Sequence, residues 1–348
     1  AEIKAADLYA EEYRNFLNIA KTEREAVNAA ISLAHAKGFM PFDRKKALKA
    51  GDKVYLNNRG KALLLAVIGT RPITDGVSIA AAHIDSPRLD LKPNPLYEDH
   101  NLAYFDTHYY GGIKKYQWTA IPLSLHGVVA LKDGKSIEIK IGEDADDPVF
   151  CVTDLLPHLA AEQMKRKAVD VIKGEDLNIL IGSRAFKDDK GSELVKLNIM
   201  KILSERYGIT ESDFLSAELE AVPAFNARDV GLDRSMIGGY GHDDRVCAYP
   251  ALTAILATEK PAYTAVTPVC SRHISDTLSL ILQPLSGRRH AMFCQPRYVC
   301  PPMSMLRMTQ FIQKFLKPET VPSSTAGLCL QNIQVQGENQ IPPTPPPS

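Results

Sequence analysis

A histidine and an aspartate stand two residues apart where an apolar run of the sequence ends. The run 77–82 predicts a buried strand, and Pro87 ends it because proline cannot donate a ladder hydrogen bond. Residues i and i+2 of a strand share a face, so Asp85 could fix the tautomer of a metal-bound His83. A structural histidine with a local aspartate partner explains the same triplet, and the residues alone leave both interpretations open.

Two adjacent aspartates form the second group of residues that could do chemistry. Asp243 and Asp244 follow a glycine-rich stretch and precede an apolar segment, 246–258, that predicts a helix. Adjacent carboxylates repel each other unless a cation compensates them. Arg245 could supply that charge, which would make the pair structural. Alternatively, one aspartate bridges two metal ions, as carboxylates do in two-metal hydrolases.

Local signals predict the elements that would position these residues. Helical spacing of apolar residues predicts two helices within 4–37, separated near Thr22, which can cap the second helix. Gly38 provides a left-handed end for that helix. Turn residues predict a hairpin over 54–69, and the strand that leads to the histidine follows it.

The middle of the chain has a different composition. Residues 93–235 are rich in aromatic and β-branched residues with repeated glycine turns, which predicts a mostly β unit. Within it, 154–167 and 192–206 predict helices and 214–222 predicts a strand. Because this block separates two stretches assigned to one site, we interpret it as an insertion into an α/β domain. The predicted limits are 1–92 plus 236–267 for the α/β domain and 93–235 for the smaller β-rich domain.

Composition restricts the partners and the compartment. The 348 residues include 41 basic and 41 acidic side chains, so there is no electrostatic basis for binding nucleic acid or an anionic membrane. No apolar run approaches the ~20 residues that span a bilayer. Six cysteines without short paired spacing indicate reduced thiols. We therefore expect a cytoplasmic protein.

Four stretches of the sequence are specific enough to compare with a known family: 81–93, 109–118, 155–160 and 217–249. In their order, and over residues ~1–267, they resemble the aspartyl aminopeptidase and vacuolar aminopeptidase I family. The resemblance implies an α/β exopeptidase domain interrupted by a smaller β-rich domain, and a homo-oligomer that is a dodecamer in the intact form. It implies two zinc ions, with cobalt or manganese as alternatives. It also implies hydrolysis of peptides with a free N-terminus, with release of acidic or neutral residues.

The resemblance also implies roles for individual residues. His83 matches a metal ligand, Asp85 matches the carboxylate that orients it, and Asp243 matches the ligand that bridges two ions. Asp244 is left outside the ligand set. His158 matches a histidine that reaches into the active site of a neighbouring subunit, although a histidine at a helix start explains it equally well.

The chain departs from the family after residue 267. Family members continue with an adjacent Glu-Glu pair and later aspartate and histidine ligands, and none of these follows here. Residues 268–348 contain three acidic residues but twelve of the 23 prolines, a composition without helical or strand periodicity. We interpret this tail as a reading-frame shift, because permitted codons for 326–335, read one base out of phase, yield a family-like string. A disordered native tail is the alternative explanation. Because the Glu-Glu pair and the later ligands are missing, we expect the chain as written to be inactive.

Two other functions compete with a damaged aminopeptidase. A non-catalytic scaffold protein could use the β-rich domain as an interface and the proline-rich end as a ligand for aromatic-lined grooves. A one-metal hydrolase could recruit His273, Asp276 or His290 from the tail, although nothing around these residues forms a supporting shell.

Overall fold

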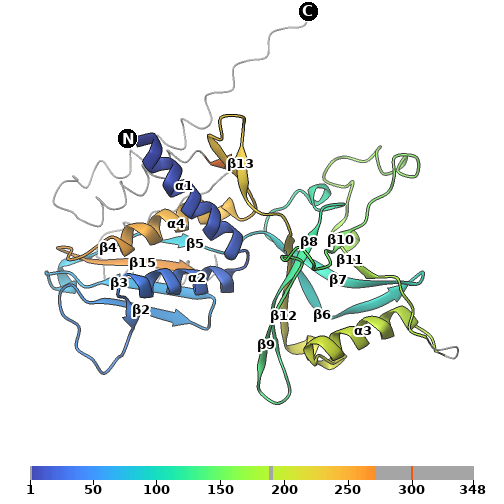
Figure 1. Ribbon diagram of the computed structural model, residues 1–348, viewed down its shortest axis with the longest axis horizontal. Helices are drawn as coiled ribbons and strands as arrows, with labels where there is room; N and C mark the ends of the chain where they lie inside the picture. Colours follow the sequence, from blue (N-terminus) through green and yellow to red (C-terminus); the bar gives the residue numbers. More distant parts are fainter. Residues whose placement is uncertain (1, 188–190, 271–298, 301–348) are drawn as a thin grey trace, which may run out of the picture.

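The structure is a computed structural model that describes residues 2–187, 191–270 and 299–300. Two sheets lie side by side in it, joined by the strands and loops between them (Figure 1). The first is a mixed sheet in the order β1-β2-β3-β15-β4, and β5 also pairs with β15. Its strands are β1 (Met40–Pro41), β2 (Lys53–Asn58), β3 (Ala62–Val67), β4 (Val77–Ile79), β5 (Ala82–His83) and β15 (Thr264–Cys270).

Helices α1 (Glu2–Ile19), α2 (Glu23–Ala36) and α4 (His242–Leu256) share one hydrophobic core with this sheet. The predicted break at Thr22 is confirmed: its side chain and that of Glu25 form a capping box at the start of α2. None of the helices in the described part of the chain combines the length and the apolar character needed to cross a membrane.

The second sheet is antiparallel, with the order β10-β11-β7-β6-β12-β8-β9, and it packs with α3 (Leu194–Tyr207) around a separate core. A hairpin of β13 (Arg228–Val230) and β14 (Met236–Gly238) with β16 (Val299–Cys300) forms a third, small sheet. The predicted α/β fold with a β-rich part is confirmed. The second sheet's strands are β6 (Arg88–Asp99), β7 (Leu102–Tyr110), β8 (Leu123–Ala130), β9 (Ser136–Ile141), β10 (Cys151–Val152), β11 (Ile179–Gly182) and β12 (Ala217–Pro223).

The predicted helix over 154–167 is wrong, because the structure has only turns there. Pro157 interrupts the segment, and the leucines Leu155, Leu156 and Leu159 are 53–70% exposed. A short helix needs a packed apolar face to be stable, and this segment has none in the described chain. The predicted strand over 214–222 is shorter than expected: a 3-10 helix, η4 (Glu211–Ser216), precedes β12.

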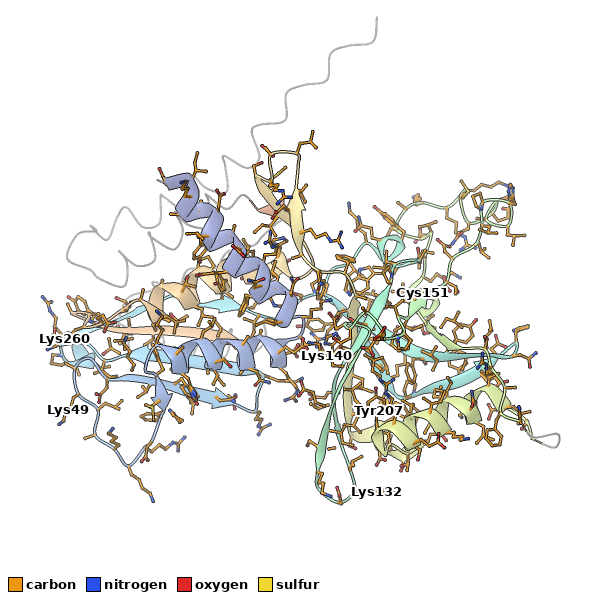
Figure 2. The ribbon with its side chains drawn as sticks, viewed as in Figure 1. Lys49, Lys132, Lys140, Cys151, Tyr207 and Lys260 are labelled. Atoms are coloured by element: carbon orange, nitrogen blue, oxygen red, sulfur yellow. The ribbon has the colours of Figure 1, made fainter. Side chains whose placement is uncertain are left out.

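A buried histidine joins the second sheet to helix α2. His126 on β8 lies between Glu25 of α2, 2.9 Å from its Nδ1, and Glu143, 3.0 Å from its Nε2. Lys21 pairs with Glu143 at 2.7 Å, and Lys140 lies 3.7 Å from Glu25 at the junction seen in Figure 2. Burial opposes the charged imidazole, but hydrogen bonds to both carboxylates outweigh it and raise the pKa of His126. At Glu143, hydrogen bonds from His126, Lys21 and Ser124 outweigh burial and lower its pKa to about 2.

We predict that His126 makes stability depend on pH. A raised folded-state pKa adds stability that is complete below the unfolded value of ~6.5 and is lost as pH rises through the folded value. His126→Gln should cost about 3–5 kcal/mol at pH 6, because it breaks a buried pair, and progressively less at higher pH. Urea unfolding of both proteins across this range measures the difference. A pH-independent His126→Gln effect would contradict the prediction.

Candidate metal site

The end of an edge strand positions His83. Strand β5 pairs in parallel with β15, with Cys270 opposite His83, and in the described chain it has no strand on its other side. The expected single strand over 77–83 is therefore two short strands, β4 and β5, separated at Ala80 and Ala81. The histidine stands at the carboxyl end of β5, where the chain turns toward the second sheet.

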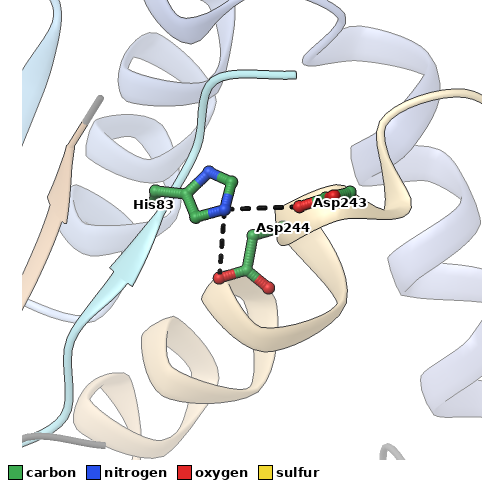
Figure 3. A group of neighbouring side chains, drawn as sticks. All are labelled: His83, Asp243 and Asp244. Atoms are coloured by element: carbon green, nitrogen blue, oxygen red, sulfur yellow. Dashed lines mark ion pairs between the residues drawn. The ribbon is translucent and has the colours of Figure 1, made fainter. Parts of the chain in front are cut away.

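The start of α4 supplies the two aspartates, as the sequence predicts. Gly241 precedes the helix with a φ of +89°, and Asp243 and Asp244 have non-helical backbone angles with a cis peptide bond between them. Figure 3 shows both carboxylates beside the imidazole, approaching it from the helix start. The Asp243 side chain is 49% exposed, whereas that of Asp244 is buried.

The imidazole has carboxylates on both of its nitrogens. Its Nε2 lies 3.3 Å from Asp243 Oδ1 and 3.8 Å from Asp244 Oδ2. Its Nδ1 lies 3.5 Å from Asp85 Oδ1 and 3.1 Å from the Asp85 carbonyl oxygen. The structure thus brings together His83, Asp85 and Asp243, and it places beside them Asp244, which the resemblance left outside the ligand set.

The surrounding acids favour a positive charge at His83. Burial opposes a charged His83, but the hydrogen bonds to Asp243 and Asp85 outweigh it and raise its pKa to about 10. Burial raises the pKa of Asp244 to about 7, and the neighbouring His83 opposes that rise. If no cation lies at Nε2, these carboxylates favour a protonated, positively charged His83.

A buried hydroxyl and a buried guanidinium fix the helix start against the strand end. Ser86 Oγ donates to the Asp243 carbonyl at 2.6 Å and accepts from Arg245 Nη1 at 2.7 Å. Arg245 Nη2 donates to the Lys21 carbonyl at 2.9 Å. No ion pair within the described residues joins Arg245 to either aspartate, so Arg245 does not neutralise the pair as the structural interpretation requires.

The residues present fit a metal ion. One ligand atom each from His83, Asp243 and Asp244 lies within 4.8 Å of the others. The Asp244 Oδ1 atom is buried and has no hydrogen-bond partner in the part of the chain that the structure describes. A histidine nitrogen with carboxylate oxygens is a donor set that zinc accepts. These are three donors, so a four-coordinate ion needs at least one more.

His158 does not join this group. It is exposed in the loop after β10, and that loop projects from the second sheet away from the first (Figure 1). Sequence reasoning assigned no role to Tyr110, whose hydroxyl donates to Asp85 Oδ2 at 2.6 Å. Burial and the Asp85 carboxylate raise the pKa of Tyr110, so its hydroxyl remains a donor. The sequence signal that could have indicated Tyr110 was its position in the family-like stretch 109–118.

Comparison with known proteins identifies the class of this fold and site. The family model described as aminopeptidase I zinc metalloprotease (M18) matches residues 16–271. The probable M18 family aminopeptidase 1 of Clostridium acetobutylicum is 53% identical over 270 residues, which cover 76% of this chain and 58% of the relative. That of Thermotoga maritima is 48% identical over 72% of this chain and 55% of the relative. The chain thus spans little more than half the length of these relatives.

Solved structures agree with the sequence comparison. The M18 family aminopeptidase from Thermotoga maritima has a TM-score of 0.75 at 39% identity, over 90% of this chain and 67% of that one. Aminopeptidase I from Clostridium acetobutylicum has a TM-score of 0.68 at 49% identity, over 75% of this chain and 58% of that one. The S. cerevisiae mApe1 dodecamer shares the fold, with a TM-score of 0.58 at 18% identity over 76% of this chain and 60% of that one.

The class is therefore that of the zinc metalloproteases, which are hydrolases. Within it, this chain belongs to the M18 aminopeptidase I family. The family resemblance inferred from the sequence is confirmed. The match ends at residue 271, and β15 continues through Cys270, three residues past the predicted end of the family-like part.

We predict that Gly241→Ala disrupts the start of α4. An added Cβ would lie 2.3 Å from Arg245 Nη1, which ties this turn to the strand end. Gly134 is a matched control because its φ of +85° is similar and no atom lies within 4 Å of its Cβ position. Gly134→Ala should cost about 1–2 kcal/mol from left-handed backbone strain alone, and Gly241→Ala distinctly more. Equal losses in urea unfolding would show that the arginine contact is unimportant.

Proposed function

We propose that this chain carries part of an aminopeptidase that uses two zinc ions to release acidic or neutral N-terminal residues from peptides. One observation supports this most directly: His83 Nε2 faces Asp243 in a chain whose residues 16–271 match a zinc metalloprotease family. Cobalt and manganese also suit a histidine and carboxylate site. The preferred N-terminal residue stays open, because nothing in the described site selects one.

Each residue has a distinct role in this proposal. His83 and Asp243 hold metal, with the half-exposed Asp243 positioned to bridge two ions and the buried Asp244 facing the same space. Asp85 orients the imidazole through its Nδ1 side. Bound zinc supplies Lewis acidity toward the scissile carbonyl and toward water.

We further propose that the chain as written does not turn over peptides. The matched region ends at 271, and residues 272–348 contain no adjacent Glu-Glu pair. Loss of a general base alone typically costs ~10²–10⁴ in rate, and the ligand set is also short. A reading-frame shift remains our explanation of the tail, and the encoding DNA tests it directly. The tail residues His273, Asp276 and His290 and the proline-rich end lie outside the described residues.

We propose that the active form is a cytoplasmic homo-oligomer. The yeast relative forms a dodecamer, and the loop after β10 exposes Leu155, Leu156 and Leu159, which a partner subunit would cover. His158 lies in the same loop, so the interface would carry it to the neighbouring site. The partly exposed Cys151 is a free thiol, as a reducing compartment allows.

We expect no turnover of aminoacyl p-nitroanilides by this chain with zinc. A repaired chain, in which the carboxyl-terminal segment of the Clostridium acetobutylicum relative replaces residues 272–348, should hydrolyse them because it regains a base and ligands. In the repaired chain, Asp243→Asn should lower kcat/KM by at least ~10²-fold, and Asp133→Asn, at an exposed turn, should have no effect. Chelator-sensitive turnover by the original chain, lost in Asp243→Asn, would contradict the claim of inactivity.

We also expect the repaired chain to lose its assembly when the exposed loop is made polar. Leu156→Asp together with Leu159→Asp should lower the mass measured by light scattering, because charged groups would enter an apolar interface. Leu232→Asp, at a fully exposed leucine of the β13–β14 turn, is the matched control. An unchanged mass in the loop variant would exclude this loop as the interface.

A further inference from the structure

A hydrogen bond from the second sheet reaches the residue that orients His83. Tyr110, the last residue of β7, donates to Asp85 Oδ2 at 2.6 Å, while the other oxygen, Oδ1, faces His83 Nδ1 at 3.5 Å. Each carboxylate oxygen of Asp85 therefore has its own partner. A carboxylate held at one oxygen cannot rotate freely about its bond, so the oxygen that faces the imidazole is held as well.

The tyrosine ring is itself held by a charged cluster. Arg88 stands opposite Tyr110 in the β6–β7 ladder, and its guanidinium carbon lies 4.3 Å from the centre of the tyrosine ring. Arg88 pairs with Glu23 at 3.3 Å, Asp90 at 2.7 Å and Glu220 at 3.2 Å, and it is 8% exposed. A buried guanidinium with three carboxylates around it has little freedom to move, and neither has the ring stacked on it.

We propose that Tyr110 is a positioning residue for the metal site, acting through Asp85 on His83. The inference rests on the proposed function, because it assumes that His83 is a metal ligand. The connection runs from the second sheet through Tyr110 and Asp85 to the imidazole, so the β-rich sheet contributes to the geometry of a site built on the other sheet. The tyrosine hydroxyl touches neither metal nor substrate in this role.

A purely structural hydroxyl would behave differently. If Tyr110 only satisfied a buried carboxylate, its loss would lower stability and leave metal affinity alone. If it acts through Asp85, its loss should weaken metal binding, and that effect should disappear once Asp85 can no longer orient the histidine. Coupling between two substitutions therefore separates the two roles.

Zinc affinity of the full chain tests the proposal, measured by competition with a chromophoric chelator and with zinc alone as the probe. Asp85→Asn should weaken binding about 10–100-fold, as loss of a residue that orients a ligand usually does. Tyr110→Phe should weaken it about threefold to tenfold, less than the full contribution of a hydrogen bond to a charged group, because the tyrosine acts on the metal only through Asp85. The double variant should bind as weakly as Asp85→Asn alone. Tyr109→Phe, the neighbour on the opposite face of β7, should bind as the parent does.

Each of the other possible results would contradict a specific part of the proposal. An unchanged affinity in Tyr110→Phe, with only a lower unfolding midpoint, would overturn the positioning role and leave the metal site intact. Additive losses in the double variant would show that Tyr110 does not act through Asp85. Zinc binding that is absent in the parent, or unaffected by His83→Ala, would overturn the metal site itself, and the role of Tyr110 would fail with it.

Discussion

The buried guanidinium of Arg245 holds together three parts of the chain that are far apart in sequence. It contacts the Lys21 carbonyl between α1 and α2, the Ser86 hydroxyl after β5 and, through that hydroxyl, the start of α4. Burying a charged group this deeply costs free energy unless it has polar partners. Here those partners are uncharged dipoles, the Ser86 hydroxyl and the Lys21 carbonyl. The arrangement therefore leaves the aspartates of the site without an ion-paired arginine in the described chain, and their charge remains for a cation.

The contact between the two sheets has a similar character. Two charged clusters lie between the second sheet and α2, which packs on the first sheet: His126 with its two glutamates, and Arg88 with its three carboxylates. Buried ion pairs contribute little net stability, because desolvation offsets most of the attraction. They do favour one relative placement, since a displaced partner leaves a buried charge alone. Such a junction suits a site whose parts come from both sheets.

Local signals predicted most of the fold. Thr22 and Glu25 form their capping box within one turn of helix, and the hairpin turn near Gly60 depends only on nearby residues. The loop after β10 failed as a predicted helix because its leucines have no packing surface within the described chain. Helical periodicity shows only that a helix would have an apolar face. The sequence does not show whether a neighbouring element packs against that face.

Part of the site was predictable because it also depends on residues that are close in sequence. His83 and Asp85 are close in sequence, and the family resemblance linked them to Asp243. The contacts of Tyr110 with Asp85, and of Arg245 with Ser86, join residues 25 and 159 positions apart. Asp244 was set aside because its neighbour matched the family, yet its buried carboxylate faces the same imidazole. No local pattern encodes such contacts, since they depend on how the elements pack.

Asp243 is the most exposed of the three candidate ligands in the described site. The neighbouring residues Asp244, Asp85 and Arg245 are buried. The Asp243 side chain, in contrast, is 49% exposed, and β5 lies at the edge of its described sheet. In the proposed site Asp243 would bridge two ions, and its exposure would leave space for the second one. The remaining ligands of a two-metal site would then have to approach from the edge beyond β5. In this chain, the sequence after Cys270 is where such ligands would be encoded, and it is there that the family match ends.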